Sequence, residues 1–265
     1  MAARLPATRS RSAPEGIVVA YAPRDTTRAR VRASLSRAHR RGVLARTHRD
    51  FRDAFRAHFV DTAVVEIAAD GDGHEPAELA REFPSVPFLA LTPFRPVDAP
   101  AIARCAELDF ADVLAEGTDD GVLSQALHAH AFSARFAAAL HEPPAPLSLG
   151  SPLQVAAWRE IVAHGGRPVG TAHVARALRV TREHLSRSFS AGGAPTLKRA
   201  IDLVRLLGAG ELAKNPGYDL HDVARLVGFS SAGKLSASVK RLVRAQASAL
   251  SALRSTDLLE RFVRG

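Results

Sequence analysis

The chain has 265 residues, of which 46% are hydrophobic and 24% charged, so it is long and apolar enough to form two packed cores. Charged residues interrupt every apolar run well short of a membrane span, and the single cysteine, Cys105, excludes an intramolecular disulfide. The net charge of +9 is unevenly distributed: residues 151–265 hold 18 Lys and Arg against 8 Asp and Glu, whereas residues 1–150 are nearly neutral. This asymmetry predicts one basic domain that binds a polyanion, although a generally basic proteome would also raise the charge.

The first 15 residues are basic and contain Pro and Ser, but they lack the apolar stretch of a secretory signal. We therefore expect a disordered basic tail at residues 1–15. We also expect the protein to lie in the cytoplasm of a bacterium, at the nucleoid, with no membrane partner.

Residues 16–141 alternate between short apolar segments and amphipathic ones. Strands are expected at residues 16–22, 42–48, 62–68, 87–94 and 111–116, and helices at 28–39, 51–59, 76–83, 99–108 and 120–140. Five such units predict an α/β domain built on a doubly wound parallel sheet. The last helix carries an apolar stripe that either covers the sheet or contacts a second copy of the chain, formed by Leu123, Ala126, Leu127, Ala131 and Ala134.

The order and length of these units resemble the receiver domain of response regulators, which has a flavodoxin-like strand order. In this alignment Glu66 takes the place of the phosphoacceptor aspartate, Thr92 falls at the switch hydroxyl, and Glu116 replaces the lysine. Tyr21 and Ala22 stand where receivers carry the acidic pair that holds Mg²⁺. Because phosphoryl transfer needs those acids, the nucleophile and the lysine, the resemblance implies a pseudo-receiver that is not phosphorylated.

The roles of two of these residues stay open. Glu66 either mimics a phosphorylated state or is a polar residue at a strand end, and Thr92 is interpreted as a loop hydroxyl. Without the phosphorylation chemistry, the domain is expected to dimerise or to receive another signal. We expect such contacts to use residues 87–116 and the helix at 120–140.

Residues 142–152 contain four prolines and are expected to link the domains. Residues 171–190 then have the pattern of a helix-turn-helix, in which one helix packs and the next enters the major groove of DNA. Ala172, Val174, Ala175 and Leu178 form the first helix face, and Arg179 with Val180 forms the turn. The second helix is expected to bury Leu185 and Phe189 behind a DNA-contacting set: Thr181, Arg182, His184, Ser186 and Arg187.

Residues 196–214 are expected to form a connecting helix, with apolar residues at near-helical spacing. Nineteen residues at ~1.5 Å each span roughly 28 Å, which approaches the ~34 Å of one DNA turn. One chain is therefore long enough to place two recognition helices in successive major grooves. Gly208 and Gly210 weaken such a helix, and they indicate either a bend or a close helix crossing.

The helix-turn-helix pattern repeats at residues 220–244. A first helix ends near Val227, and Gly228 supplies the turn. Ser230 or Ser231 is expected to cap a second helix that buries Leu235, Val239 and Leu242. The residues of this unit expected to contact DNA are Ser230, Ser231, Lys234, Ser238, Lys240 and Arg241.

Together, the two units resemble the DNA-binding domain of AraC-type transcription regulators, in which one long helix joins two helix-turn-helix units. The matching residues are Leu185–Arg187 with Phe189, Arg205 and Ala209 in the connecting helix, Ala224, and Val227–Ser231. The chain departs from the family at two aromatic positions, here Leu235 and Val239, at a glycine, here Arg244, and at Thr-Pro, here Gln246–Ala247. The resemblance implies an all-α domain at residues 153–255, followed by a tail at 256–265.

The sequence therefore predicts a DNA-binding transcription regulator whose partner is double-stranded DNA, with a possible homodimer through the N-terminal domain. The alternative is a protein-interaction or small-molecule-sensing adaptor with weakened DNA binding, since the second unit departs from its family. No nucleophile–base pair or phosphate loop is recognisable, so we do not expect an enzyme. No Cys/His cluster has zinc spacing either, and we expect no metal and no cofactor.

Overall fold

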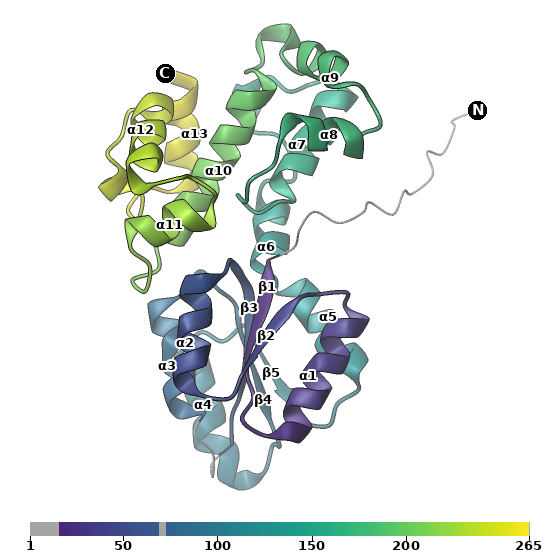
Figure 1. Ribbon diagram of the computed structural model, residues 1–265, viewed down its shortest axis with the longest axis vertical. Helices are drawn as coiled ribbons and strands as arrows, with labels where there is room; N and C mark the ends of the chain where they lie inside the picture. The colour runs from purple at the N-terminus through teal and green to yellow at the C-terminus, as the bar shows by residue number, and fades with distance from the viewer. Residues whose placement is uncertain (1–15, 69–72, 265) are drawn as a thin grey trace, which may run out of the picture.

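The computed structural model describes residues 16–68 and 73–264, and the expected tail at residues 1–15 lies outside this range. An α/β domain and a helical domain are stacked along the long axis of the molecule (Figure 1). Within the described ranges, no helix is long and apolar enough to cross a lipid bilayer.

The α/β domain is built on five parallel strands: β1 (Ile17–Tyr21), β2 (Gly42–Ala45), β3 (Val60–Glu66), β4 (Phe88–Thr92) and β5 (Asp112–Ala115). Their order in the sheet is β2-β1-β3-β4-β5. Every residue of the central strand β3 is buried. This is the doubly wound, flavodoxin-like sheet that the alternating pattern predicts.

Helices cover both faces of the sheet (Figure 1). On one face lie α1 (Asp25–Arg37) and α5 (Asp120–Ala129), which pack on a cluster that includes Val18, Val31 and Leu127. On the other face lie α2 (His48–Ala57), α3 (His74–Glu82) and α4 (Ala99–Glu107). The predicted elements before residue 120 are therefore confirmed in type and order, and their bounds differ by a few residues.

The predicted single helix over 120–140 is wrong, because α5 ends at Ala129 and a separate helix, α6, runs over Phe132–Ala139. A buried carboxylate explains where α6 begins. Asp61, on β3, accepts hydrogen bonds from the backbone N–H and the hydroxyl of Ser133 at 2.7 Å each, and also pairs with Arg40. A carboxylate at a helix N-terminus satisfies free N–H groups and complements the helix dipole.

The apolar stripe of this region is mostly used within the domain. Leu123, Ala126 and Leu127 are buried in the cluster beneath α1 and α5, and Ala131 is also buried, whereas Ala134 is exposed. These buried members of the stripe therefore cover their own sheet.

The helical domain surrounds one long helix, α10 (Leu197–Ala213), which Thr196 caps by accepting a hydrogen bond from the N–H of Arg199. Gly208 lies where α10 meets the turn after α7: a Cβ there would lie 2.7 Å from the Cα of Gly166. The sequence indicated a bend or a close helix crossing, and Gly208 instead makes a close contact with a turn. The other helices are α7 (Pro152–Val162), α8 (Thr171–Ala177), α9 (Arg182–Phe189), α11 (Leu220–Leu226), α12 (Ala232–Val243) and α13 (Ser255–Arg264).

Two segments expected to lie outside the cores are packed. Residues 256–264 of the expected tail fall within α13, which buries Leu258 and Phe262 and contacts α10 and α12. The expected linker at 142–152 contains a 3₁₀ turn, Ala145–Leu147, and buries Leu147 and Leu149. Apolar residues within both segments explain the difference, because burying them stabilises the fold.

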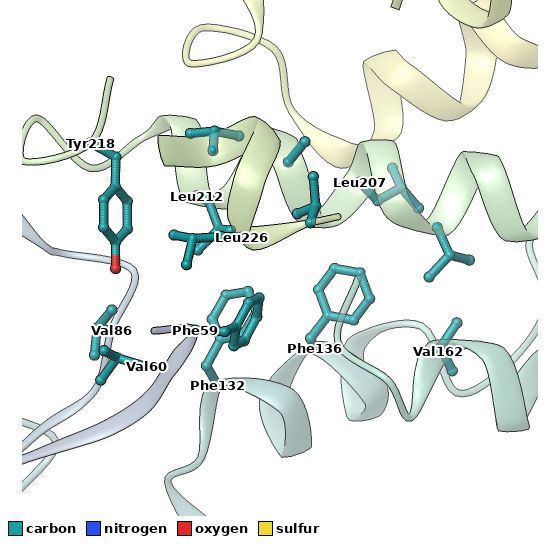
Figure 2. Packing of buried hydrophobic residues seen from close by; sticks show 14 of the residues in the cluster. Phe59, Val60, Val86, Phe132, Phe136, Val162, Leu207, Leu212, Tyr218 and Leu226 are labelled. Carbon is teal, nitrogen blue, oxygen red and sulfur yellow. The ribbon is translucent and has the colours of Figure 1, made fainter. Parts of the chain in front are cut away.

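The two domains share one hydrophobic cluster, seen from close by in Figure 2. Phe59, Phe132 and Phe136 from the α/β domain face Leu207, Leu212 and Leu226 from the helical domain (Figure 2). Because Phe59 directly precedes β3, the helical domain lies against the edge of the sheet where the strands begin.

Polar contacts add to this interface at the loop between α10 and α11. Tyr218 contacts the ring of Phe83 edge-on, with centroids 4.8 Å apart, and the N–H of Gly217 donates to the carbonyl of Glu82 at 2.9 Å. Asn215 accepts a hydrogen bond from the N–H of Ser85 at 2.9 Å and donates to the hydroxyl of the same residue at 2.6 Å. The second helix-turn-helix unit is thereby fastened to the α/β domain.

Candidate nucleic-acid interface

The first helix-turn-helix unit consists of α8, a short turn and α9. The turn passes through Arg179, whose φ of +57° is left-handed, and the N–H of Val180 donates to the carbonyl of Ala175 at 3.0 Å. Thr181 then begins α9 by accepting a hydrogen bond from the N–H of His184 at 3.1 Å. Leu185 and Phe189 are fully buried, as predicted, whereas Ala172 is exposed and does not belong to the packed face.

The outward side of α9 is polar and basic. Arg182, His184 and Arg187 are exposed, Ser186 is partly exposed, and the capping residue Thr181 is exposed beside them. Arg182 lies 3.4 Å from Glu183 in an exposed ion pair, which water and salt screen strongly. The structure thus brings the five predicted contact residues of this unit together on one helix.

The second unit consists of α11, a turn at Gly228 and α12. Gly228 has a φ of +75°, and a Cβ there would lie 2.1 Å from the Cγ of Pro168, so the turn requires glycine. Ser231 caps α12 by accepting a hydrogen bond from the N–H of Lys234 at 3.2 Å, which settles the alternative between Ser230 and Ser231. Leu235, Val239 and Leu242 are buried as predicted.

A partly buried arginine on the connecting helix holds this turn. The guanidinium of Arg205 donates two hydrogen bonds to the carbonyl of Val227, at 3.1 and 3.0 Å, and lies 4.1 Å from the centre of the Phe229 ring. Burial lowers the pKa of Arg205, and the nearby carboxylate of Asp202 opposes that shift. Arg205 thus links α10 to the turn that orients α12.

The outward side of α12 carries fewer of the predicted contacts. Ser230, Ser231, Lys234 and Lys240 are exposed, but Ser238 is 6% exposed, so its predicted DNA contact is wrong. Its position three residues after Leu235 and four before Leu242 places it within the apolar stripe. Arg241 is exposed, yet its guanidinium lies 3.5 Å from the carboxylate of Asp202 on α10, at the flank of the helix.

The departures from the AraC pattern are accommodated by packing. Leu235 and Val239, which replace aromatic residues of that pattern, are completely buried. Arg244, which replaces its glycine, ends α12 in the left-handed conformation with a φ of +50°. The fold therefore accommodates these substitutions, because the two positions stay apolar and buried and one non-glycine residue adopts a less favourable backbone angle.

Comparison with family models agrees with this geometry. Residues 174–252, which run from α8 past the end of α12, match the model described as a helix-turn-helix domain. Residues 174–252 form an AraC-type helix-turn-helix domain. The match contains both recognition helices and the whole of the connecting helix between them.

Solved structures of response regulators resemble the chain at low identity. Full-length FixJ from B. japonicum is 16% identical, with a TM-score of 0.39 over 85% of this chain and 96% of that one. Response regulator StyR is 14% identical, with a TM-score of 0.38 over 85% and 98%. RcsB from Salmonella enterica serovar Typhimurium, bound to promoter rprA, is 17% identical, with a TM-score of 0.34 over 66% and 93%. A search of curated proteins found no match.

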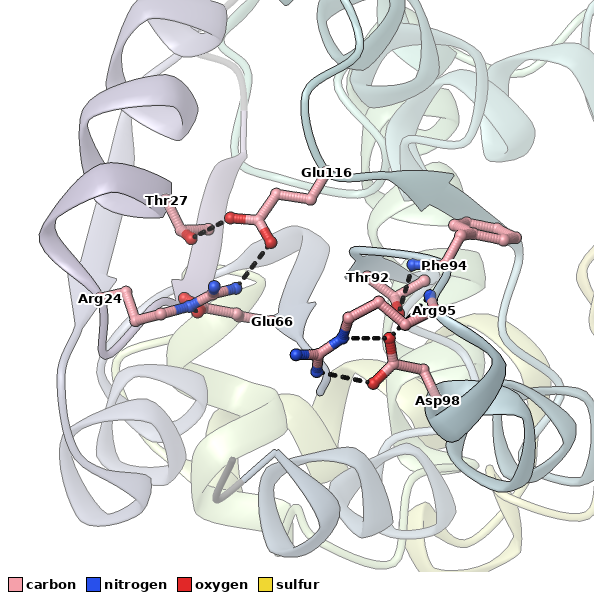
Figure 3. Close-up of polar contacts among 8 residues, drawn as sticks. All are labelled: Arg24, Thr27, Glu66, Thr92, Phe94, Arg95, Asp98 and Glu116. Carbon is pink, nitrogen blue, oxygen red and sulfur yellow. Dashed lines mark hydrogen bonds and ion pairs between the residues drawn. The ribbon is translucent and has the colours of Figure 1, made fainter. Parts of the chain in front are cut away.

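The residues that align with the receiver phosphorylation site lie at the carboxyl ends of the strands, at the end of the sheet farthest from the helix-turn-helix domain (Figure 1, Figure 3). Tyr21 and Ala22, at the end of β1, are buried and offer no carboxylate. Glu66 is 4% exposed, Thr92 is completely buried, and Glu116 is partly exposed. The hydroxyl of Thr92, the last residue of β4, accepts a hydrogen bond from the N–H of Phe94 at 3.4 Å.

An arginine that the sequence analysis did not single out bridges the two acids (Figure 3). The guanidinium of Arg24 contacts the carboxylate of Glu66 and lies 2.8 Å from that of Glu116, to which the hydroxyl of Thr27 also donates at 3.3 Å. Partial burial lowers the pKa of Arg24, but the hydrogen bonds to Glu66 and Glu116 outweigh it and raise the pKa. The guanidinium of Arg24 thus occupies the space between the two carboxylates.

Proposed function

We propose that this protein is a transcription regulator that binds DNA sequence-specifically through α9 and α12. The observation that carries the proposal is the pair of capped recognition helices joined by α10, each with exposed basic residues on its outward side. The 17 residues of α10 span roughly 26 Å at ~1.5 Å per residue, close to the spacing of successive major grooves. The charge of residues 151–265 supplies the attraction to phosphate.

Salt dependence of DNA binding tests this proposal. We expect the full chain to bind selected genomic duplexes with an affinity that falls as salt rises, at a log–log slope of about −0.9 per phosphate neutralised. Fluorescence anisotropy with a selected duplex and a scrambled duplex of equal length measures both affinity and sequence preference. Equal binding to the two duplexes, or binding unaffected by salt, would contradict the proposal.

The α/β domain, in this proposal, is not switched by phosphorylation. Tyr21 and Ala22 cannot hold Mg²⁺, and Glu116 repels a phosphoryl group where receivers use a lysine to attract it. Arg24 already neutralises the remaining carboxylate, Glu66. Incubation of the full chain with a small phosphodonor and Mg²⁺ should leave its mass unchanged, while an intact receiver domain gains one phosphoryl group. A gain of that mass at Glu66 or a neighbouring acid would overturn this part.

Self-association is the input that we propose for this domain. Phe94 and Val97, between β4 and α4, are large apolar residues with 49% and 62% exposure, and Val122 on α5 has 43%. These exposed side chains lie in the two segments that the sequence analysis singled out for dimerisation. Light scattering of the full chain at high protein concentration should show a dimer, and a strict monomer would remove the hypothesis.

Small-molecule sensing is a second candidate, favoured by a cavity between the domains. The cavity has a volume of about 730 Å³, within the usual range of roughly 300–1,000 Å³ for ligand sites. Phe132, Phe136 and Leu140 line it from the α/β domain, and Lys214 and Leu259 from the helical domain. Amphipathic acids that raise the thermal midpoint of the protein, but not of a Leu259→Trp variant that fills the cavity, would support this function.

A further inference from the structure

Three side chains beneath the first helix-turn-helix unit bring their polar atoms together. Glu160 lies on α7, His164 in the turn directly after it, and His173 in the first turn of α8. Their ligand atoms all lie within 4.8 Å of one another. The carboxylate Oε1 of Glu160 is 3.6 Å from the Nε2 of His173 and 3.8 Å from the Nε2 of His164. Two imidazoles and one carboxylate therefore face a common point.

The burial of His164 shows that these contacts are incomplete. The residue is 1% exposed, and within the described part of the chain neither of its ring nitrogens has a hydrogen-bond partner. The distances to Glu160 are longer than a hydrogen bond, and the rings of His164 and His173 meet edge-on, with centroids 5.1 Å apart. A buried imidazole without a partner is unfavourable, so the cluster lacks a group that its nitrogens can bind.

We propose that Glu160, His164 and His173 form a binding site for a divalent transition metal ion of the Zn²⁺ type, with water completing the coordination. Zinc binds imidazole nitrogen and carboxylate oxygen at about 2.0–2.2 Å, which places tetrahedral ligand atoms about 3.4 Å apart. The two distances from Glu160 need to shorten by only a few tenths of an ångström. The distance between the two imidazole nitrogens has to shorten by more. His173 can supply this movement, because its side chain is partly exposed and can rotate.

The chemistry of the donors selects the class of metal. Two of the three ligands are imidazole nitrogens, which suit Zn²⁺ and its transition-metal neighbours, whereas Mg²⁺ and Ca²⁺ prefer oxygen ligands alone.

The position of the site gives it a structural effect. Glu160 and His164 belong to α7 and its following turn, while His173 belongs to α8, so one ion would hold the two helices together. Both helices also contact α9, the first recognition helix. The proposed ion would thus stabilise the base on which α9 rests.

Titration of the chelator-treated full chain with Co²⁺ tests the site directly. We expect one ion to bind saturably, with the visible absorption bands of a four-coordinate Co²⁺ centre, and Zn²⁺ to displace it. His173→Gln and Glu160→Gln each remove one ligand with little change in size, and each should lower the Zn²⁺ affinity by at least about tenfold. His221→Gln is the matched control, because His221 is exposed on α11, outside the cluster, and the variant should bind as the wild type does.

A folding measurement distinguishes the loss of a metal ligand from the loss of the fold. Circular dichroism should show that the variants are folded, and Zn²⁺ should raise the thermal midpoint of the wild type and of His221→Gln but not of His173→Gln. Absence of saturable Co²⁺ binding by the wild type would overturn the proposal. Undiminished affinity in both folded ligand variants would also overturn it, because the ion would then bind elsewhere. None of these measurements involves DNA, so their failure is separate from a failure of the proposed function.

Discussion

The two helix-turn-helix units are held by different side chains. In the second unit, Arg205 reaches from α10 to the turn itself and binds the carbonyl of Val227. In the first unit, a neutral amide takes this part: Gln154 of α7 donates to the carbonyls of Phe189 and Ala191, at 2.9 and 3.1 Å, just after the recognition helix. The first unit is thus fixed at the end of its recognition helix, and the second at the start.

The units also differ in their attachment to the α/β domain. Arg225 of α11 contacts the carbonyl of Arg56 and lies 3.3 Å from that of Ala57, at the end of α2. The first unit is attached at a point that does not belong to α8 or α9. There, the indole N–H of Trp158 on α7 donates to the carbonyl of Leu140 at 2.7 Å. The comparison teaches that the helix preceding α12 contacts the α/β domain directly, whereas in the first unit α7, which packs on α9, makes such a contact.

The largest effect that we expect separates the two turns. Gly228→Ala should lower the free energy of unfolding by about 3 kcal/mol, because it combines a left-handed backbone with a clash against the ring of Pro168. Gly233→Ala, in the exposed part of α12, is the control and should be neutral or slightly stabilising. Urea denaturation measures both. An unchanged stability of Gly228→Ala would show that the turn has room to move.

Alanine substitution of Arg205 and of Gln154 should show which unit loses more folding free energy when its fixing side chain is removed. Arg205→Ala loses charged hydrogen bonds and a cation–π contact, and should cost roughly 3 kcal/mol of folding free energy. Gln154→Ala loses neutral hydrogen bonds and should cost about 2 kcal/mol. The exposed Arg176→Ala should stay within about 0.5 kcal/mol of the wild type. Equal losses of folding free energy in Arg205→Ala and Gln154→Ala would show that the charged side chain stabilises its unit no more than the neutral one does.

DNA affinity should favour the first unit. Arg182→Ala and Arg187→Ala should each weaken binding of a selected duplex by about 1–3 kcal/mol, because arginine can bind guanine through two hydrogen bonds. Lys234→Ala and Lys240→Ala should cost less, and equally on selected and scrambled duplexes, as phosphate contacts do. Anisotropy at fixed salt gives the ranking, and the reverse order would make α12 the principal reading helix.

The smallest effect that we expect is a gain. Arg179→Gly should stabilise the first unit by less than about 1 kcal/mol, since glycine accepts the left-handed angle of this turn but also makes the unfolded chain more flexible. Arg176→Gly, within α8, should instead destabilise by about 1 kcal/mol. Thermal unfolding of the two variants distinguishes these signs, and a loss in Arg179→Gly would show that the arginine side chain itself stabilises the turn.

Sequence patterns predicted the features that depend on neighbouring residues. Strand and helix periodicity, the caps Thr181 and Ser231 and the turn glycine Gly228 are local signals, and each appears in the structure as expected. The thiol of Cys105 is buried, and burial raises its pKa to about 11. The domain boundaries and the DNA contacts themselves stay predictions.

The remaining features depend on residues distant in the sequence. The break between α5 and α6 depends on Asp61 of β3, and the bridge between Glu66 and Glu116 depends on Arg24. His173 meets Glu160 only after two helices have packed, although the four-residue spacing of Glu160 and His164 is visible in the sequence. Single-residue patterns could not predict these contacts, because tertiary packing decides them.

The contact between Gly166 and Gly208 constrains how this sequence can change. A Cβ on either residue would fall within 2.7 Å of the other's Cα. A smaller residue at the second position cannot make room for a side chain at the first, because glycine is already the smallest residue. In a saturation mutagenesis library selected for folding, both positions should accept glycine alone. Among diverging descendants, the pair should therefore persist together or disappear together with the path of the chain between α7 and α8.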